Sequence, residues 1–208
     1  GKNHLYVIDL EDDEIHEDQP AAILADALAG DGIVWKDEPR EGKIKLLAGK
    51  DGLLGVDTAA LAAFNMVEEV MCATLHNHTL VKKGGLVAAT RAIPLIMKRA
   101  PIERAAAIAR QNGAVITVKP LRKARVGLVI TGNEVYNGLI EDRFEPVLTA
   151  KMQDLGSEVA AVAFAPDDAG LIHAAIRSHL EAGCDLLLLS GGMSVDPDDV
   201  TRQGTRSA

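Results

Sequence analysis

The sequence predicts an α/β protein: a three-layer α/β/α domain on a parallel sheet, preceded by a smaller mixed α/β domain. Two observations support this prediction. Apolar residues make up 48% of the chain and aromatic residues only 3%, a mix that suits helices on a parallel sheet better than an aromatic-cored β-sandwich. In the second half, apolar runs of strand length alternate with segments of helix length, and crossovers of that length make consecutive strands parallel.

The two domains are expected to meet at the segment KPLRKAR (119–125), which is basic, contains a proline and joins two strand-like runs. The elements before it are irregular and those after it are regular. This change places the boundary near residue 122, between an N-terminal mixed α/β domain (1–121) and a second α/β domain (122–208).

Glycine, proline and charged residues punctuate the first domain. A helix is expected from Pro20, which suits a first helical position, to Gly30, which suits a C-terminal cap. Asp57 is expected to cap a helix over TAALAAFN, and another helix is expected over 101–112, before Gly113. Strands are expected in LYVI, KIKLLA, GLLGV, GGLVAATRAIPL and AVITV.

The second domain reads as β-α-β-α-β. Its strands are expected at RVGLVIT (125–131), EVAAVAF (158–164) and DLLLLS (185–190). The first helix is expected over about 143–155, where apolar residues recur at helical spacing. Asp167 or Asp168 is expected to cap the second helix. Its apolar face is expected to contain Ile172, Ile176 and Leu180.

Three loops follow these strands: TGNEVYNGLIED (131–142), APDD (165–168) and SGGMSVDPDD (190–199). Because parallel strands point one way, the loops after them lie along one edge, where ligands of open α/β sheets bind. Each loop carries carboxylates, and two carry glycines. The ligand site is therefore expected at this edge.

The third loop has two features that suit a charged ligand. Gly191 and Gly192 let the backbone approach a ligand closely, and their N–H groups, with the hydroxyls of Ser190 and Ser194, are suited to cradle a phosphate. An ordinary strand-to-helix turn is the alternative. Carboxylates beside a phosphate suit magnesium, although helix capping near Pro197 would account for one or two of them. The carboxylates are Asp196, Asp198 and Asp199.

Other candidate chemistry is weaker. His76 and His78 have a spacing that can share a metal, but no third ligand is evident nearby. Cys72 and Cys184 lack the spacing of a metal or redox pair, and a reducing, cytoplasmic setting is the simplest interpretation. Cys184 is expected in the core. No apolar run approaches the roughly 20 residues of a membrane span, and no phosphate-binding or dinucleotide glycine motif follows the strand at 125–131.

Charge is unevenly distributed. The net charge of −8 argues against general nucleic-acid binding. Residues 82–125 nevertheless hold eleven of the 22 Lys and Arg residues and one acid, whereas acids cluster at 9–18. The basic run is either a solvated face or a surface for an anionic ligand or acidic partner. We expect self-association, with these cations near an acidic surface: Lys82, Lys83, Arg122 and Lys123.

The stretches VGLVITGNEV, GLIEDRFEPVL, LGSEV, PDD and LLLLSGGMSVDPDDVT together resemble the molybdopterin-binding domain of the molybdenum-cofactor biosynthesis family. The resemblance covers about residues 125–203. Residues 18–121 resemble the region that precedes this domain in molybdopterin molybdotransferase-like proteins. The resemblance implies a pterin dithiolate phosphate as ligand, glycine loops that hold its phosphate and adenylate parts, and acidic residues for magnesium or molybdate chemistry.

Matched residue by residue, the resemblance assigns ligand binding to Gly132, Asn133, Glu134, Asp142, Asp167, Asp168, Gly191, Gly192 and Ser194. It makes Asp199 the best match to the functional aspartate, with Asp196 beside it, and implies metal binding by Asp196, Asp198 and Asp199. The chain departs from the family at Arg143-Phe144, where Ser-Asn is usual, and at Asp196-Pro197, where a glycine is usual.

The resemblance also implies that the second domain continues beyond residue 208, so the chain is expected to be a fragment. The leading expectation is molybdopterin binding in cofactor synthesis, with metal insertion into molybdopterin or its adenylate assisted by magnesium. A non-catalytic pterin-binding module, such as a sensor or carrier, and a nucleotide pyrophosphatase-like enzyme are the alternatives. Members of this family are commonly oligomers.

Overall fold

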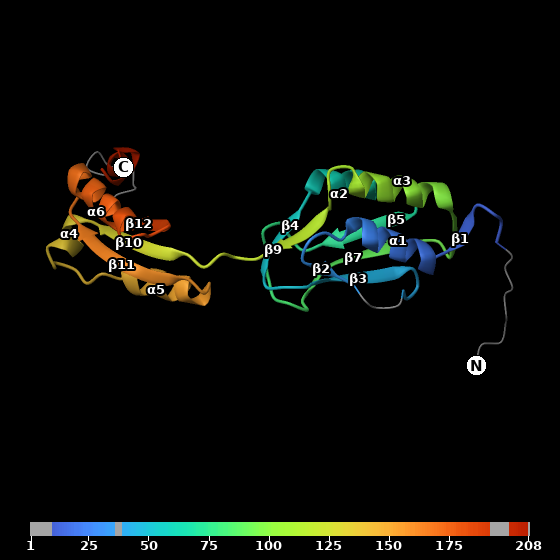
Figure 1. The fold of residues 1–208 in the computed structure, drawn as a ribbon, viewed down its shortest axis with the longest axis horizontal. Coiled ribbons are helices and arrows are strands. Elements are labelled where there is room, and N and C mark those ends of the chain that lie inside the picture. Colours follow the sequence, from blue (N-terminus) through green and yellow to red (C-terminus); the bar gives the residue numbers. More distant parts are fainter. Residues whose placement is uncertain (1–9, 36–38, 192–199, 208) are drawn as a thin grey trace. The chain divides into compact units, whose positions relative to one another are not determined.

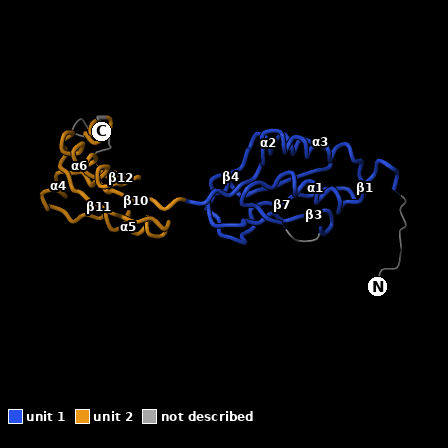
Figure 2. The backbone as a smooth tube through the Cα atoms, viewed as in Figure 1, with its two compact units in different colours: residues 1–121 blue, residues 122–208 orange. Residues whose placement is uncertain are grey.

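The computed structural model describes residues 10–35, 39–191 and 200–207. The chain divides into two compact units, residues 1–121 and 122–208 (Figure 2). Within these 208 residues, the first unit is the longer of the two. The strand expected at LYVI lies outside the described residues.

The first unit is built from antiparallel strands and three helices that pack on them (Figure 1). One sheet has the order β2-β3-β7-β5, a smaller one has the order β6-β4-β9, and β1 pairs with β8. Helix α1 packs against β3 and β7, and α2 packs against β5. The strands are β1 (Glu14–His16), β2 (Ile33–Val34), β3 (Lys43–Ala48), β4 (Gly52–Val56), β5 (Val70–Thr74), β6 (Leu80–Val81), β7 (Leu86–Ala92), β8 (Ile96–Lys98) and β9 (Ile116–Lys119). The helices are α1 (Asp18–Leu28), α2 (Thr58–Asn65) and α3 (Arg99–Arg110).

The core of the first unit follows from the alternation of its strands. In β3 the side chains of Ile44 and Leu46 are buried, whereas Lys43 and Lys45 are exposed, as expected for a sheet with one face on the core. The buried face meets the apolar stripe of α1, in which Leu24 and Leu28 are fully buried. The expected strands KIKLLA and GLLGV and the helix over TAALAAFN are confirmed.

Two helix starts test the capping rules. The Asp57 carboxylate accepts the N–H groups of Ala59 and Ala60, at 3.1 and 2.9 Å, so the predicted cap of α2 is confirmed. The start of α1 was predicted two residues late, because the first turn closes from Ala21 N–H to the carbonyl of Glu17. Pro20 fits inside that turn, since N–H groups there have no partner within the helix.

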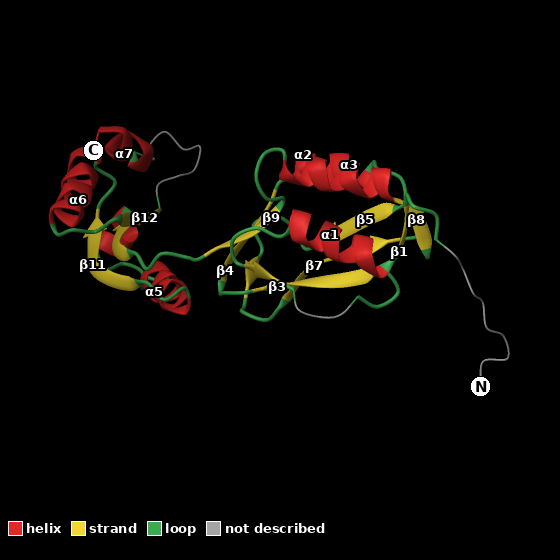
Figure 3. Ribbon diagram, turned by 45° about the vertical axis from the view of Figure 1, so that its right-hand side comes forward, coloured by secondary structure: helices red, strands yellow, loops and turns green. Residues whose placement is uncertain are grey.

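The second unit is a three-layer α/β/α structure, as predicted. Strands β10 (Arg125–Thr131), β11 (Glu158–Ala165) and β12 (Leu186–Ser190) are parallel, in the order β11-β10-β12. Helix α5 (Phe144–Asp154) covers one face through Leu148 and Met152. Helix α6 (Ala169–Glu181) covers the other face (Figure 3). The remaining helices are the short α4 (Asn133–Tyr136) and α7 (Thr201–Ser207).

The apolar face of α6 differs from the prediction at its last turn. Ile172 and Ile176 are buried, but Leu180 is 46% exposed and His179 takes its place at 5% exposure. The imidazole fits because Gly127 of β10 has no Cβ; a Cβ there would lie 2.8 Å from the ring. The ring is also satisfied, since His179 Nε2 lies 2.9 Å from the carbonyl oxygen of Leu128.

Several cations of the basic run pair with carboxylates of their own unit. Lys82 Nζ lies 3.1 Å from Asp51 Oδ2 in the first unit, and the Arg122 guanidinium contacts Asp185 in the second. These pairs are exposed to solvent, so each contributes little to stability. Part of the run therefore needs no external partner, and self-association stays a prediction.

Candidate functional site

The three strands of the second unit end level with one another. Thr131, the last residue of β10, is in register with Ala165 of β11, and Ile130 is in register with Ser190 of β12. The described beginnings of all three loops therefore lie at one sheet edge, as predicted. This shared edge is the candidate site.

The first two loops are tied together by a reciprocal pair of hydrogen bonds. The N–H of Asn133 donates to Asp167 Oδ2 at 3.1 Å, and the N–H of Asp167 donates to Asn133 Oδ1 at 3.2 Å. The N–H of Gly132 also donates to the carbonyl of Ala165 at 3.2 Å, from a backbone with a φ of 136° that favours glycine. Three predicted site residues thus come together here, and two of them hold the loops in place.

The third loop begins with a close backbone crossing. Gly191 has a φ of 94°, and a Cβ at this position would lie 2.1 Å from the carbonyl oxygen of Thr131. Beneath it, the Thr131 hydroxyl lies 3.0 Å from both the carbonyl oxygen of Ser190 and the hydroxyl of Thr201. Both threonines are buried. Neither threonine was predicted as a site residue; the only signal in the sequence was the position of Thr131 at the end of a buried strand.

Two predicted ligand carboxylates are helix caps. Asp142 accepts the N–H groups of Phe144 and Glu145, both at 2.9 Å, at the start of α5. Asp168 accepts the N–H of Leu171 at 2.9 Å at the start of α6. Glu134 is exposed on α4. The caps explain the positions of Asp142 and Asp168 without a ligand.

Two buried oxygens at the edge lack a hydrogen-bond partner among the described residues: Asp167 Oδ1 and Ser190 Oγ. Ser190 is only 8% exposed, at the end of β12. A buried oxygen without a partner costs about 1–3 kcal/mol. A ligand at this edge that offers a donor to Asp167 and an acceptor to Ser190 would recover that cost.

A magnesium site is not formed by the part of the chain that the structure describes. No group of three His, Cys, Asp or Glu side chains there is placed to hold a metal, and the caps at Asp142 and Asp168 are already engaged. His76 and His78 are exposed and belong to no such group. The predicted catalytic, metal and loop residues Gly192, Ser194, Asp196, Asp198 and Asp199 lie outside the described residues.

Residues 127–208 match the model of a family described as a probable molybdopterin binding domain. The second unit contains a probable molybdopterin-binding domain. The match begins within β10 and includes all three loops of the candidate edge. It does not extend to the first unit.

Curated relatives match part of the chain. CinA-like proteins of Mycobacterium tuberculosis and Mycobacterium leprae are 40% and 38% identical to it over 78 residues, which is 38% of this chain. The chain spans 18% of the length of these relatives. Among the described residues, no helix is both long and apolar enough to cross a membrane.

Two solved structures resemble the chain, one over less than half of its length and one over most of it. The molybdopterin biosynthesis enzyme MoaB from Thermus thermophilus is 28% identical, with a TM-score of 0.39, over 40% of this chain and 54% of that one. The molybdopterin biosynthesis MoeA protein from Pyrococcus horikoshii is 16% identical, with a TM-score of 0.33, over 93% of this chain and 66% of that one. The fold assignment rests on the strands and helices described above and not on these two likenesses.

Proposed function

We propose that the second unit binds molybdopterin at the sheet edge formed by residues 131–134, 165–168 and 190–191. The match to a molybdopterin-binding domain supports the ligand class. The observation that carries the location is a pair of buried oxygens, on Asp167 and Ser190, that have no hydrogen-bond partner among the described residues. A pterin ring offers N–H donors to a carboxylate, and a phosphate accepts a hydrogen bond from a serine hydroxyl.

The proposed role of the described residues is positioning. The two hydrogen bonds between Asn133 and Asp167 fix the distance between the first two loops. The contact between the hydroxyls of Thr131 and Thr201 fixes the start of the third loop. Such a frame binds a ligand without reorganising itself, which lowers the entropic cost of binding. The frame supports binding more directly than catalysis.

The proposed chemistry beyond binding depends on Asp196, Asp198 and Asp199. Carboxylate oxygens are the ligands that magnesium prefers, and a magnesium ion beside the phosphate would neutralise charge while molybdate reacts with the dithiolate. We propose metal insertion into molybdopterin or its adenylate as the reaction, in a cytoplasmic oligomer. The departures from the family pattern at Arg143-Phe144 and Asp196-Pro197 favour the alternative of a binding module without catalysis.

Binding is tested by anaerobic titration of the 208-residue chain with molybdopterin, followed by ligand fluorescence and by amide shifts in the NMR spectrum. The Asp167→Asn variant is expected to weaken binding about tenfold or more, the size expected for losing a hydrogen bond to a charged group. Glu181→Gln is the matched control, because Glu181 is an exposed carboxylate at the far end of α6. Shifts confined to residues 20–110 would refute the proposed location.

Catalysis is tested separately with adenylated molybdopterin, molybdate and magnesium. Turnover that is lost in Asp199→Asn, with molybdopterin binding retained, supports metal insertion. Binding without turnover supports the module. Hydrolysis of ADP-ribose in the absence of any pterin supports the pyrophosphatase alternative.

A further inference from the structure

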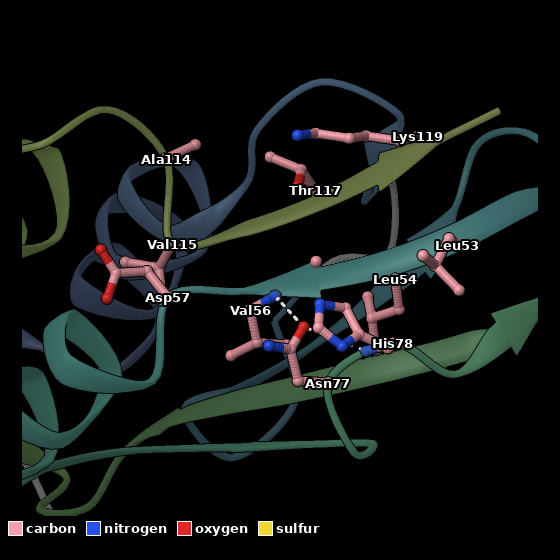
Figure 4. Close-up of a pocket in the computed structure, with 11 residues that line it drawn as sticks. Leu53, Leu54, Val56, Asp57, Asn77, His78, Ala114, Val115, Thr117 and Lys119 are labelled. Atoms are coloured by element: carbon pink, nitrogen blue, oxygen red, sulfur yellow. Dashed lines mark hydrogen bonds between the residues drawn. The ribbon is translucent and has the colours of Figure 1, made fainter. Parts of the chain in front are cut away.

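The first unit contains a cavity of about 380 Å³ that the molybdopterin site does not use (Figure 4). Its floor is the outward face of β4 and β9 in the sheet β6-β4-β9. The register places Leu53 opposite Lys119 and Gly55 opposite Thr117 on this face. The volume lies within the roughly 300–1,000 Å³ of small-molecule sites.

Gly55 opens the floor of this cavity. A Cβ on Gly55 would lie 2.7 Å from Thr117 Oγ1, so any larger residue would press on the hydroxyl. A glycine inside a strand weakens the strand and often marks a place where a ligand approaches the backbone. The φ of Gly55 is not in the left-handed region, so backbone conformation does not explain the glycine.

Asn77 and His78 form the wall of the cavity beside β4, and His78 has an unusual backbone conformation. Asn77 Oδ1 accepts the N–H of Val56 at 2.9 Å, in place of a strand carbonyl, and also the N–H of His78 at 3.0 Å. The N–H of His78 donates to the carbonyl of Leu54 as well, at 2.8 Å. His78 has a φ of 63°, which costs a residue other than glycine about 1 kcal/mol or more. These hydrogen bonds hold the backbone of His78 at the rim of the cavity, which His78 lines.

The opposite wall carries a cation and a hydroxyl. Figure 4 shows Lys119 and Thr117 on β9, across β4 from His78. No described carboxylate lies within 4 Å of Lys119 Nζ, whereas Lys50, Lys82 and Lys98 of the same unit all have such partners. The one carboxylate of the lining, Asp57, is engaged at the start of α2.

We infer that this cavity binds a small molecule through an anionic group, a phosphate or a carboxylate, placed over Gly55 between Lys119 and Thr117 on one side and His78 on the other. The ammonium of Lys119 supplies the charge, and the hydroxyl of Thr117 and the ring of His78 supply directed hydrogen bonds. Leu53 provides an apolar surface for the rest of the ligand. The site is separate from the proposed molybdopterin site and does not depend on it.

The test is titration of the full chain with three probes, inorganic phosphate, AMP and hexanoate, followed by amide shifts. Shifts are expected at 53–57, 77–79 and 114–119, and the tightest probe identifies the anionic group. The Lys119→Gln variant is expected to weaken that probe about tenfold or more, and Thr117→Val is expected to weaken it by a smaller factor. Lys45→Gln is the matched control, because Lys45 is exposed on β3 without a described ion pair.

Gly55→Ala provides a second line of evidence, because it fills the floor without changing charge. Weaker binding in this variant, with an unchanged spectrum elsewhere, supports the inferred position of the ligand. If none of the three probes shifts these amides at concentrations of tens of millimolar, or if Lys45→Gln weakens binding as much as Lys119→Gln, the inference is wrong. Failure of molybdopterin to bind would leave this result unaffected, since the two sites have no residue in common.

Discussion

Replacing Gly191 by alanine is expected to destabilise the second unit more than the same change at a glycine whose turn has open space around it. Two costs add. A φ of 94° costs a residue with a Cβ about 1–2 kcal/mol. The new Cβ would also lie 2.1 Å from the carbonyl oxygen of Thr131, well inside the roughly 3.3 Å of an ordinary C···O contact, and relief of such overpacking costs about 1–3 kcal/mol more.

The sum, about 2–5 kcal/mol, is a large part of the roughly 5–15 kcal/mol that stabilises a typical domain. Gly183→Ala is the matched control. Gly183 has a φ of 81° but nothing within 4 Å of an added Cβ, so it measures the conformational cost alone. The difference between the two variants measures the close crossing of the third loop over the end of β10.

Urea unfolding followed by two probes separates the units. Trp35 is the only tryptophan and packs against the core of the first unit, so its fluorescence reports that unit. Hydrogen exchange of the β10 amides reports the second. Gly191→Ala should lower β10 protection well beyond the effect of Gly183→Ala and leave the fluorescence transition in place. Equal effects of the two variants would refute the close crossing.

Four further outcomes are expected. Thr131→Val should destabilise the second unit by about 1–3 kcal/mol, because it leaves buried oxygens unpaired; urea unfolding with no change would show that the contacts are not made. The N–H of Arg125 and the guanidinium of Arg122 lower the pKa of Asp185. The carboxylate therefore stabilises the second unit above about pH 4, and this contribution is lost as pH falls through the lowered pKa. In Asp185→Asn, hydrogen-exchange protection of the β10 amides should depend less on pH in this acidic range. Burial raises the pKa of the Cys72 thiol to about 12, so in a Cys184→Ala background alkylation at neutral pH should await unfolding, and rapid native labelling would contradict the burial. Self-association driven by the basic run should weaken at high salt, because the Debye length falls to roughly 3 Å at about 1 M ionic strength. Sedimentation that shows a monomer at every salt concentration would mean that the run is a solvated face.

The sequence was sufficient for elements whose signals are local. The strands of the second unit are continuous apolar runs bounded by glycine and charge, and the structure places β10 where RVGLVIT predicted it. The caps at Asp57 and Asp168 are also local, because each carboxylate bonds N–H groups two or three residues ahead. In such cases the sequence contains both partners within one turn.

The sequence was insufficient where the partner is distant. The bond between Asn133 and Asp167 joins residues 34 positions apart, and no pattern in either loop indicates it. The burial of His179 depends on the absence of a Cβ at Gly127, on another element. Asp142 is an exception, because its partners are only two and three residues ahead; the resemblance assigned it to a ligand, and the structure shows it as a helix cap.

Helix α6 has unequal attachments at its two ends, and this has a mechanical consequence. His179 fastens its last turn to the middle of β10, whereas Asp168 joins its first turn to the second loop. The eleven residue steps from Asp168 to His179 span about 16 Å of helix. A displacement of about 1 Å at the loop therefore tilts α6 by only about 4° around His179. Helix α7 packs on α6, with Gly204 against Ile172, so the tilt reaches the chain that follows the third loop. Strain imposed on one side of the candidate edge is thus transmitted to the other side through the rigid helix α6.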